Sequence, residues 1–173
     1  MNKSLSALAF ASIAVLAASA AYAQAQAPAA NAAVRTERNM SLDLANRIAT
    51  AAVAACSEKG YAVTTTVVDR AGTVRAVQRA DNAGPHTLEA SRAKAFTSAS
   101  AKNTTLAMME NTQKNPAAAT LVYIPGFLLV GGGVPVKVGN EVIGAVGIGG
   151  APGGHLDEQC ALAALDKVAD LLK

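Results

Sequence analysis

The glycine-flanked segment of residues 131–155 constrains the fold of this chain more than any other part of its sequence. It reads GGGVPVKVGNEVIGAVGIGGAPGGH, in which two apolar runs are joined by Gly139-Asn140. This two-residue link predicts a β-hairpin with strands at residues 134–138 and 141–148. The flanking glycines carry no Cβ, so another backbone or a ligand can approach closely at both ends of the hairpin.

A second hairpin is predicted earlier in the chain. Residues 61–68 are rich in β-branched side chains, and the turn Asp69-Arg70-Ala71-Gly72 leads back into the alternating run of residues 73–79. Such a turn between two apolar runs is typical of antiparallel pairing. A short apolar run at residues 127–130 is interpreted as a buried strand that enters the first glycine cluster.

Four helices are predicted around these strands, over residues 42–59, 88–102, 104–114 and 156–173. Ser41, Thr87 and Asn103 are suitable N-cap residues, and Gly60 and Pro116 stop the first and third helices. The resulting order is α-ββ-αα-βββ-α, with helices segregated from hairpins. This order predicts an α+β fold of the profilin/PAS-like type, a single antiparallel sheet with flanking helices.

The helix predicted over residues 88–102 is rich in alanine and serine. Small side chains on all sides of a helix allow close packing against more than one neighbour. The sequence leaves two interpretations open, namely a contact between subunits and a crowded position inside the domain.

The first residues of the chain are predicted to be a targeting segment rather than part of the fold. Lys3 precedes an apolar run, and Ala21-Tyr22-Ala23 fits the small-residue cleavage rule of a secretory signal peptide over residues 1–23. Residues 24–39 are rich in Ala, Gln and Pro and are expected to be a flexible leader, so the domain covers residues 40–173. We therefore expect a periplasmic or secreted protein, and no later apolar run is long enough to span a membrane.

Two cysteines, Cys56 and Cys160, remain in the exported domain. In an oxidising compartment they can form a disulfide bond between the first and last helices. The alternative is a pair of buried thiols that pack as small apolar side chains. The sequence does not decide between the two, because a disulfide requires a Cα separation that spacing alone does not supply.

Several functional classes are excluded by composition and motif. The net charge is only +3, the basic residues are scattered and tryptophan is absent, so no nucleic-acid surface is predicted. Gly147 and Gly149 begin like a dinucleotide fingerprint, but Pro152 stands where the third glycine is required. There is neither a P-loop nor a G-x-S-x-G nucleophile motif. The two histidines lack the partners of a zinc site.

Six polar residues surround one loop and the helix after it, and they are the best candidates for a common cleft. They are Arg79, Asp81, His86, Glu89, Arg92 and Lys94. His86 and His155 each follow a glycine-containing loop at the predicted start of a helix, and a neutral imidazole can bind a metal ion. The structural alternative is a solvated, charged helix start.

Three blocks of this sequence resemble the GlcG/HbpS-like family. They are VVDRAGTVRA, RADNAGPHTLEASRAKAFTSAS and GGGVPVKVGNEVIGAVGIGGAPGGHLDEQCA. The resemblance extends from Met40 to Lys173 and keeps the order of the blocks. It implies an antiparallel sheet flanked by helices and a homo-oligomer, often an octamer. Some exported members of the family bind haem, a related domain is attached to corrinoid adenosyltransferases, and other members come from glycolate-type catabolic operons.

The resemblance also implies a binding site for haem or another tetrapyrrole. Its pocket wall would be formed by His86, Thr87, Arg92, Lys94 and Thr97, and its floor by Gly131, Gly132 and Gly133. His86 is the expected axial ligand of the iron and His155 is the second choice, while Arg or Lys can pair with the propionates.

Three functions remain open at this stage. The leading one is an exported haem or tetrapyrrole-binding protein without turnover of its own, acting in haem or iron sensing or sequestration. The second is an enzyme or accessory protein of organic-acid catabolism that uses Arg79, His86 and Lys94 on a carboxylate. The third is an oligomeric scaffold without a ligand.

Overall fold

The computed structural model describes residues 33–173. The chain divides into two compact units, Met1–Thr36 and Glu37–Lys173. Of the first unit only residues 33–36 are described, and these form neither helix nor strand. The predicted signal peptide and most of the predicted leader therefore lie outside the described residues.

The second unit contains an antiparallel sheet of four strands in the order β2-β1-β4-β3. The strands are β1 (Thr64–Asp69), β2 (Val74–Arg79), β3 (Gly133–Val138) and β4 (Glu141–Gly149). Both predicted hairpins are present, and they join through the antiparallel pairing of β1 with β4, where Thr66 lies opposite Gly147. The α+β fold with a single antiparallel sheet is confirmed.

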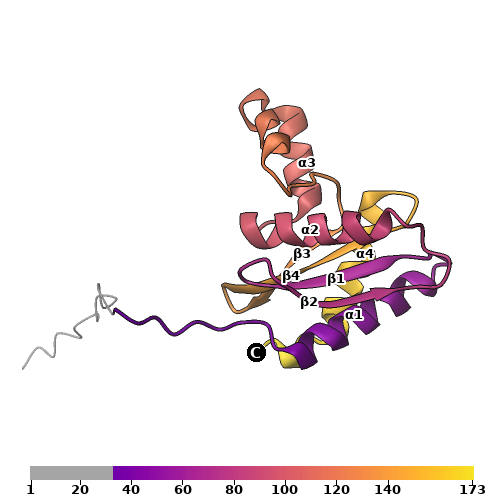
Figure 1. Cartoon of the computed structure of the whole chain (residues 1–173), viewed down its shortest axis with the longest axis horizontal. Coiled ribbons are helices and arrows are strands. Elements are labelled where there is room, and N and C mark those ends of the chain that lie inside the picture. The colour runs from indigo at the N-terminus through magenta and orange to yellow at the C-terminus, as the bar shows by residue number, and fades with distance from the viewer. Residues whose placement is uncertain (1–32) are drawn as a thin grey trace, which may run out of the picture. The chain divides into compact units, whose positions relative to one another are not determined.

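Helices cover both faces of this sheet (Figure 1). Helix α2 (Thr87–Ala101) crosses one face, and α1 (Leu42–Ser57) and α4 (Gly154–Lys167) pack side by side on the other. Helix α3 (Thr105–Lys114) and the 3₁₀-helix η1 (Pro116–Tyr123) extend away from α2 as an arm, and a short 3₁₀-helix, η2 (Ala169–Leu171), follows α4.

The prediction of a strand over residues 127–130 was wrong, because this segment is irregular. The amide of Leu128 donates to Thr97 Oγ1 of helix α2 at 2.8 Å, and that of Phe127 donates to Ile124 O, so neither pairs with a neighbouring strand. The ring of Phe127 also meets Phe96 of α2 edge-to-face, with centroids 6.3 Å apart. The segment therefore connects the arm to the sheet and packs along α2.

Two of the predicted helix caps also differ by one residue. His86, not Thr87, is the N-cap of α2, and Thr104, not Asn103, caps α3 through its side chain. The Thr87 hydroxyl is occupied elsewhere, since it donates to Gly84 O and shares a 2.6 Å hydrogen bond with Thr64 Oγ1. Thr87 thus fastens the start of α2 to strand β1.

Helix α2 lies very close to the sheet because the strands beneath it carry small residues. A Cβ on Gly147 would overlap with Ser91 O, and one on Gly133 would overlap with Lys94 O. Thr66 and Ser91 share a buried hydrogen bond of 2.8 Å across the same interface. The sequence left open whether this small-residue helix contacts another subunit or occupies a crowded position inside the domain. For the side of α2 that faces the sheet, the second interpretation holds.

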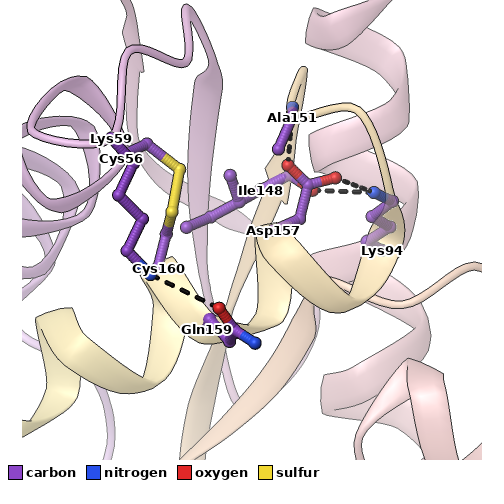
Figure 2. The surroundings of a disulfide bond; sticks show 8 residues. All are labelled: Cys56, Lys59, Lys94, Ile148, Ala151, Asp157, Gln159 and Cys160. Atoms are coloured by element: carbon purple, nitrogen blue, oxygen red, sulfur yellow. Dashed lines mark hydrogen bonds and ion pairs between the residues drawn. A yellow bond between two sulfur atoms is a disulfide. The ribbon is translucent and has the colours of Figure 1, made fainter.

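The main apolar core lies on the opposite face, between the sheet and helices α1 and α4. Ile48, Val67, Val146 and Ile148 are among its fully or nearly fully buried side chains. Cys56 and Cys160 form a disulfide bond within this core, with a Cα separation of 5.4 Å (Figure 2). The question left open by the sequence is therefore answered in favour of the bond, which joins α1 to α4 across 104 residues of chain.

Ion pairs hold the first residues of the second unit against the turns of both hairpins. Arg38 pairs with Glu141 at 2.7 Å, and Arg70 pairs with both Glu37 and Glu141. Hydrogen bonds from Arg38 and Arg70 lower the pKa of the Glu141 carboxyl. Met40 N also donates to Ile143 O, so the chain enters the domain at the turn end of β4.

Removing the disulfide should destabilise the domain without changing its fold. We expect the double variant Cys56→Ala/Cys160→Ala to lose about 2–5 kcal/mol of unfolding free energy, because the unfolded chain is no longer cross-linked. Urea denaturation of wild type and variant, each with and without dithiothreitol, measures this loss. The variant is its own control, since the reductant should shift only the wild-type midpoint; equal midpoints throughout would contradict the prediction.

Candidate functional site

A cleft of about 350 Å³ lies between the start of α2, the loop from β4 to α4, and the segment before β3. Its walls combine apolar side chains, glycine backbone and three polar side chains. The lining residues are His86, Ala90, Lys94, Leu128, Val130, residues 149–154 and Asp157. The cleft thus joins the second glycine cluster of the sequence to the His86 helix.

Lys94 and Asp157 form a buried ion pair in the wall of this cleft (Figure 2). Their Nζ and Oδ2 atoms are 2.7 Å apart, and the two side chains are only 4% and 3% exposed. Lys94 Nζ also donates to Ile148 O at 2.9 Å, and Asp157 Oδ1 accepts from Ala151 N at 3.0 Å. The pair therefore ties α2, the end of β4 and the start of α4 together.

The electrostatics of the pair follow from its burial. Desolvation raises the pKa of the Asp157 carboxyl above its ordinary value, and the adjacent Lys94 ammonium acts in the opposite direction. Asp157 is therefore a carboxylate that depends on Lys94 for its charge, and separating the two would leave an uncompensated charge in the interior.

Glycines make room for this arrangement at the edge of the cleft. A Cβ on Gly132, whose φ is +117°, would lie 2.6 Å from Asp157 Cβ and 3.1 Å from Lys94 Nζ. Gly131 and Gly154 contact each other backbone to backbone, since a Cβ on Gly154 would meet Gly131 O at 2.7 Å. The two glycine clusters of the sequence thus bring the start of β3 against the start of α4.

His86 lines the cleft from the N-cap position of α2, where it is exposed to solvent. Its imidazole lies over Gly84, since a Cβ on that glycine would lie 2.7 Å from the ring Cε1. No hydrogen bond or ion pair engages the imidazole within residues 33–173. The ring nitrogens are therefore available to a ligand or a metal ion.

The other residues expected in the site occupy different positions. Thr87 and Thr97 are buried and hydrogen-bonded inside the domain, and Arg92 forms a surface ion pair with Glu89 at 2.9 Å. Residues 131–133 do not line the cleft, whose wall includes residues 149–154 instead; Gly132 and Gly133 pack against Lys94, and Gly131 packs against Gly154. His155 is exposed and also does not line it.

Two larger depressions have fewer side chains suited to binding a ligand or a metal ion than this cleft has. One, of about 570 Å³, is lined by Tyr61, Arg79 and Asp81 together with the end of α1. The Arg79 guanidinium is occupied there by Ala83 O, and Arg79 is thereby separated from the cleft of His86 and Lys94. The other, of about 420 Å³, lies along α1 and includes Arg47 and Lys167. Neither contains a histidine or a buried charge.

Neither a metal-ligand cluster nor a membrane-spanning helix is found in the part of the chain that the structure describes. Residues 33–173 contain no group of three or more His, Cys, Asp or Glu side chains that could hold a metal ion. In the same residues, every helix is too short or too polar to cross a membrane.

Sequence reasoning missed Asp157, Leu128 and Val130 as residues of the cleft. Asp157 lies in the first turn of α4, where the helix dipole favours an acid whether or not it has a partner. The available signal was Lys94, a cation in the middle of a helix of small residues, because a buried lysine needs a carboxylate. The spacing of 63 residues gave no indication of which carboxylate it was.

A family model described as "Haem degrading protein HbpS-like" matches residues 40–166. The chain belongs to this family. The HbpS-like match covers all the elements that form the cleft, from α2 to the start of α4.

Solved structures agree with this assignment. A double mutant of HbpS from Streptomyces reticuli shares 34% sequence identity with a TM-score of 0.74, covering 84% of this chain and 98% of that one. Protein ORFY of Klebsiella pneumoniae shares 30% identity with a TM-score of 0.74, covering 79% and 94%. A PduOC–haem complex, at 23% identity and a TM-score of 0.66 over 74% and 94%, has the same fold. Comparison with curated proteins gave no significant match.

The buried pair should respond very differently to single and double substitution. We expect Lys94→Met to cost about 3–5 kcal/mol of unfolding free energy, because it leaves Asp157 buried without a cation. The double variant Lys94→Met/Asp157→Asn should recover a large part of that loss. Urea denaturation measures both, with Arg92→Met as the control on the same helix, expected to change stability by no more than about 1 kcal/mol. A double variant that is no more stable than Lys94→Met would refute the coupling.

Proposed function

We propose that this HbpS-like protein binds haem, or a similar tetrapyrrole, in the cleft of His86. The observation that carries the proposal is an unengaged imidazole at the mouth of a partly apolar cleft. Membership of a family described as haem-degrading supports it, as does the haem complex of the structurally similar PduOC.

The residues of the cleft suit a haem held at one edge. His86 offers a nitrogen ligand to iron, and Ala90, Leu128 and Val130 offer apolar contact to the ring. At about 350 Å³ the cleft is near the lower end of the range for ligand pockets, so it would enclose part of a macrocycle and leave the rest exposed. When bound, haem would supply an iron centre able to accept an axial ligand and one electron.

Titration with haemin tests this proposal. Wild type should shift the Soret band of haemin, and His86→Ala should weaken haemin binding by about tenfold or more, because the iron loses its axial nitrogen. His155→Ala, which removes the other histidine, should retain the wild-type spectrum. Absence of any Soret shift in wild type would remove the proposal, and loss in His155→Ala alone would reassign the ligand.

We further propose that the protein is exported and serves in haem or iron sensing or sequestration. The secretory features of residues 1–23 support export. The disulfide between Cys56 and Cys160 supports it independently, since such bonds persist mainly in oxidising compartments. A binding role without turnover suits a cleft whose only buried charges already neutralise each other.

A homo-oligomer is the final part of this proposal, with eight copies as the number that the family resemblance suggests. The arm of α3 and η1 supports it, because η1 buries none of its residues within the chain. Val122, Tyr123 and Ile124 at its end are 51%, 82% and 41% exposed. A second copy of the chain would cover this apolar surface.

The arm can be tested by the native mass of the protein. Val122→Glu/Tyr123→Glu should convert the assembly to a smaller species, because two charges would be buried in the contact. Light scattering coupled to gel filtration measures the mass. Val77→Glu, at an exposed valine of β2, is the matched control and should leave the mass unchanged. A monomeric wild type would contradict the oligomer proposal, and an unchanged mass in the arm variant would contradict the role of the arm in the contact.

A further inference from the structure

We infer that the His86 cleft is a receptor for a carboxylate, which Lys94 and the first amides of α4 would hold while the apolar wall contacts the rest of the ligand. This inference rests on the proposed function in placing the ligand in the same cleft. The carboxylate could belong to a tetrapyrrole propionate or to a free organic acid, and the two sources share one recognition chemistry.

The first element of this receptor is the Lys94 ammonium group. An ammonium has three N–H donors, and within the described residues two of them are taken, by Ile148 O and Asp157 Oδ2. Lys94 lines the cleft although only 4% of its side chain is exposed. A donor remains for a ligand at a position where water competes poorly, which strengthens a charge-assisted hydrogen bond.

The second element is the beginning of helix α4. Its N-cap is Gly153, which has no side chain to cap the helix, and the amides of Gly153 and Gly154 make no hydrogen bond within residues 33–173. Gly153 and Gly154 both line the cleft. Free amides and the positive end of the helix dipole favour an anion beside the buried cation.

The acid already present in the cleft does not oppose such an anion strongly. Asp157 uses Oδ2 for Lys94 and Oδ1 for Ala151 N, and it is the one acidic residue among those that line the cleft. The pair is neutral as a whole, so an incoming carboxylate meets a neutral site with unused donors rather than a net negative charge.

The remaining wall selects the kind of anion. Ala90, Leu128, Val130, Ala151 and Pro152 present apolar surface next to the donors. A carboxylate attached to an apolar body satisfies both halves of the cleft. Inorganic phosphate would keep its charge but lose hydration against this wall without gaining apolar contact. We therefore expect monocarboxylates to bind and phosphate to bind far more weakly.

A comparison of haemin with its dimethyl ester tests the contribution of the carboxylates to affinity independently of the rest of the haem. Both keep the iron for His86, but the ester lacks the propionate charges. Wild type should bind haemin about tenfold more tightly than the ester, the value of one charge-assisted hydrogen bond. Lys94→Met/Asp157→Asn, in which the pair is removed together, should lose most of this preference and keep only what the amides of α4 contribute. Lys102→Met, an exposed lysine at the end of the same helix, should keep the wild-type ratio.

A free organic acid is tested without haem. Addition of sodium butyrate to ¹⁵N-labelled protein should shift the amide resonances of residues 153–155, whereas butyramide and sodium phosphate should not. Equal affinity for haemin and its ester, together with no butyrate shift, overturns the inference while leaving haem binding intact. No Soret shift with either porphyrin but a butyrate shift removes the haem proposal and keeps the receptor. A ratio that falls equally in Lys102→Met overturns the role of Lys94.

Discussion

The close approach of helix α2 to the sheet is the contact on which the rest of the structure depends. It is permitted by missing side chains, since Gly133 and Gly147 lie directly under the backbone of α2. Ser and Thr hydroxyls on both sides then pair across the interface instead of being buried without partners. Because the helix lies so close to the sheet, Lys94 reaches the carbonyl of Ile148, and His86 lies at the mouth of the cleft. Larger residues in the strands would raise the helix and move both groups.

Helix α4 is fixed from two sides by different kinds of bond (Figure 2). Cys160 joins it covalently to α1, and Asp157, less than one turn earlier, joins it to α2 through Lys94. The loop before the helix is fastened to the same carboxylate through Ala151 N. The cleft is therefore bordered by backbone whose position is set from both layers of the domain, which suits a site that must present amides at a constant distance.

The sequence predicted the fold well where local chemistry decides the structure. Gly139-Asn140 and the Asp69 to Gly72 turn fix their hairpins, and both are present. The run of residues 127–130 was misassigned because a short apolar segment has the same pattern as a strand and as a loop packed on a helix. Of the candidate cleft, His86 and Lys94 could be selected from the sequence, because they stand out at the start and in the middle of a helix of small residues. Asp157 and the apolar wall depend on tertiary contacts between distant segments, and no local pattern encodes them.

The position where the chain enters the domain has a practical consequence. Glu141, held by Arg38 and Arg70, begins strand β4, and Gly149 at its other end lines the cleft. The strand has nine residues, so its two ends lie roughly 27 Å apart along the strand. Coupling the protein to a sensor chip or a fluorophore through its amino-terminal side would leave the cleft facing the solution. Ligand exchange could then be followed on the immobilised protein without steric interference from the attachment point.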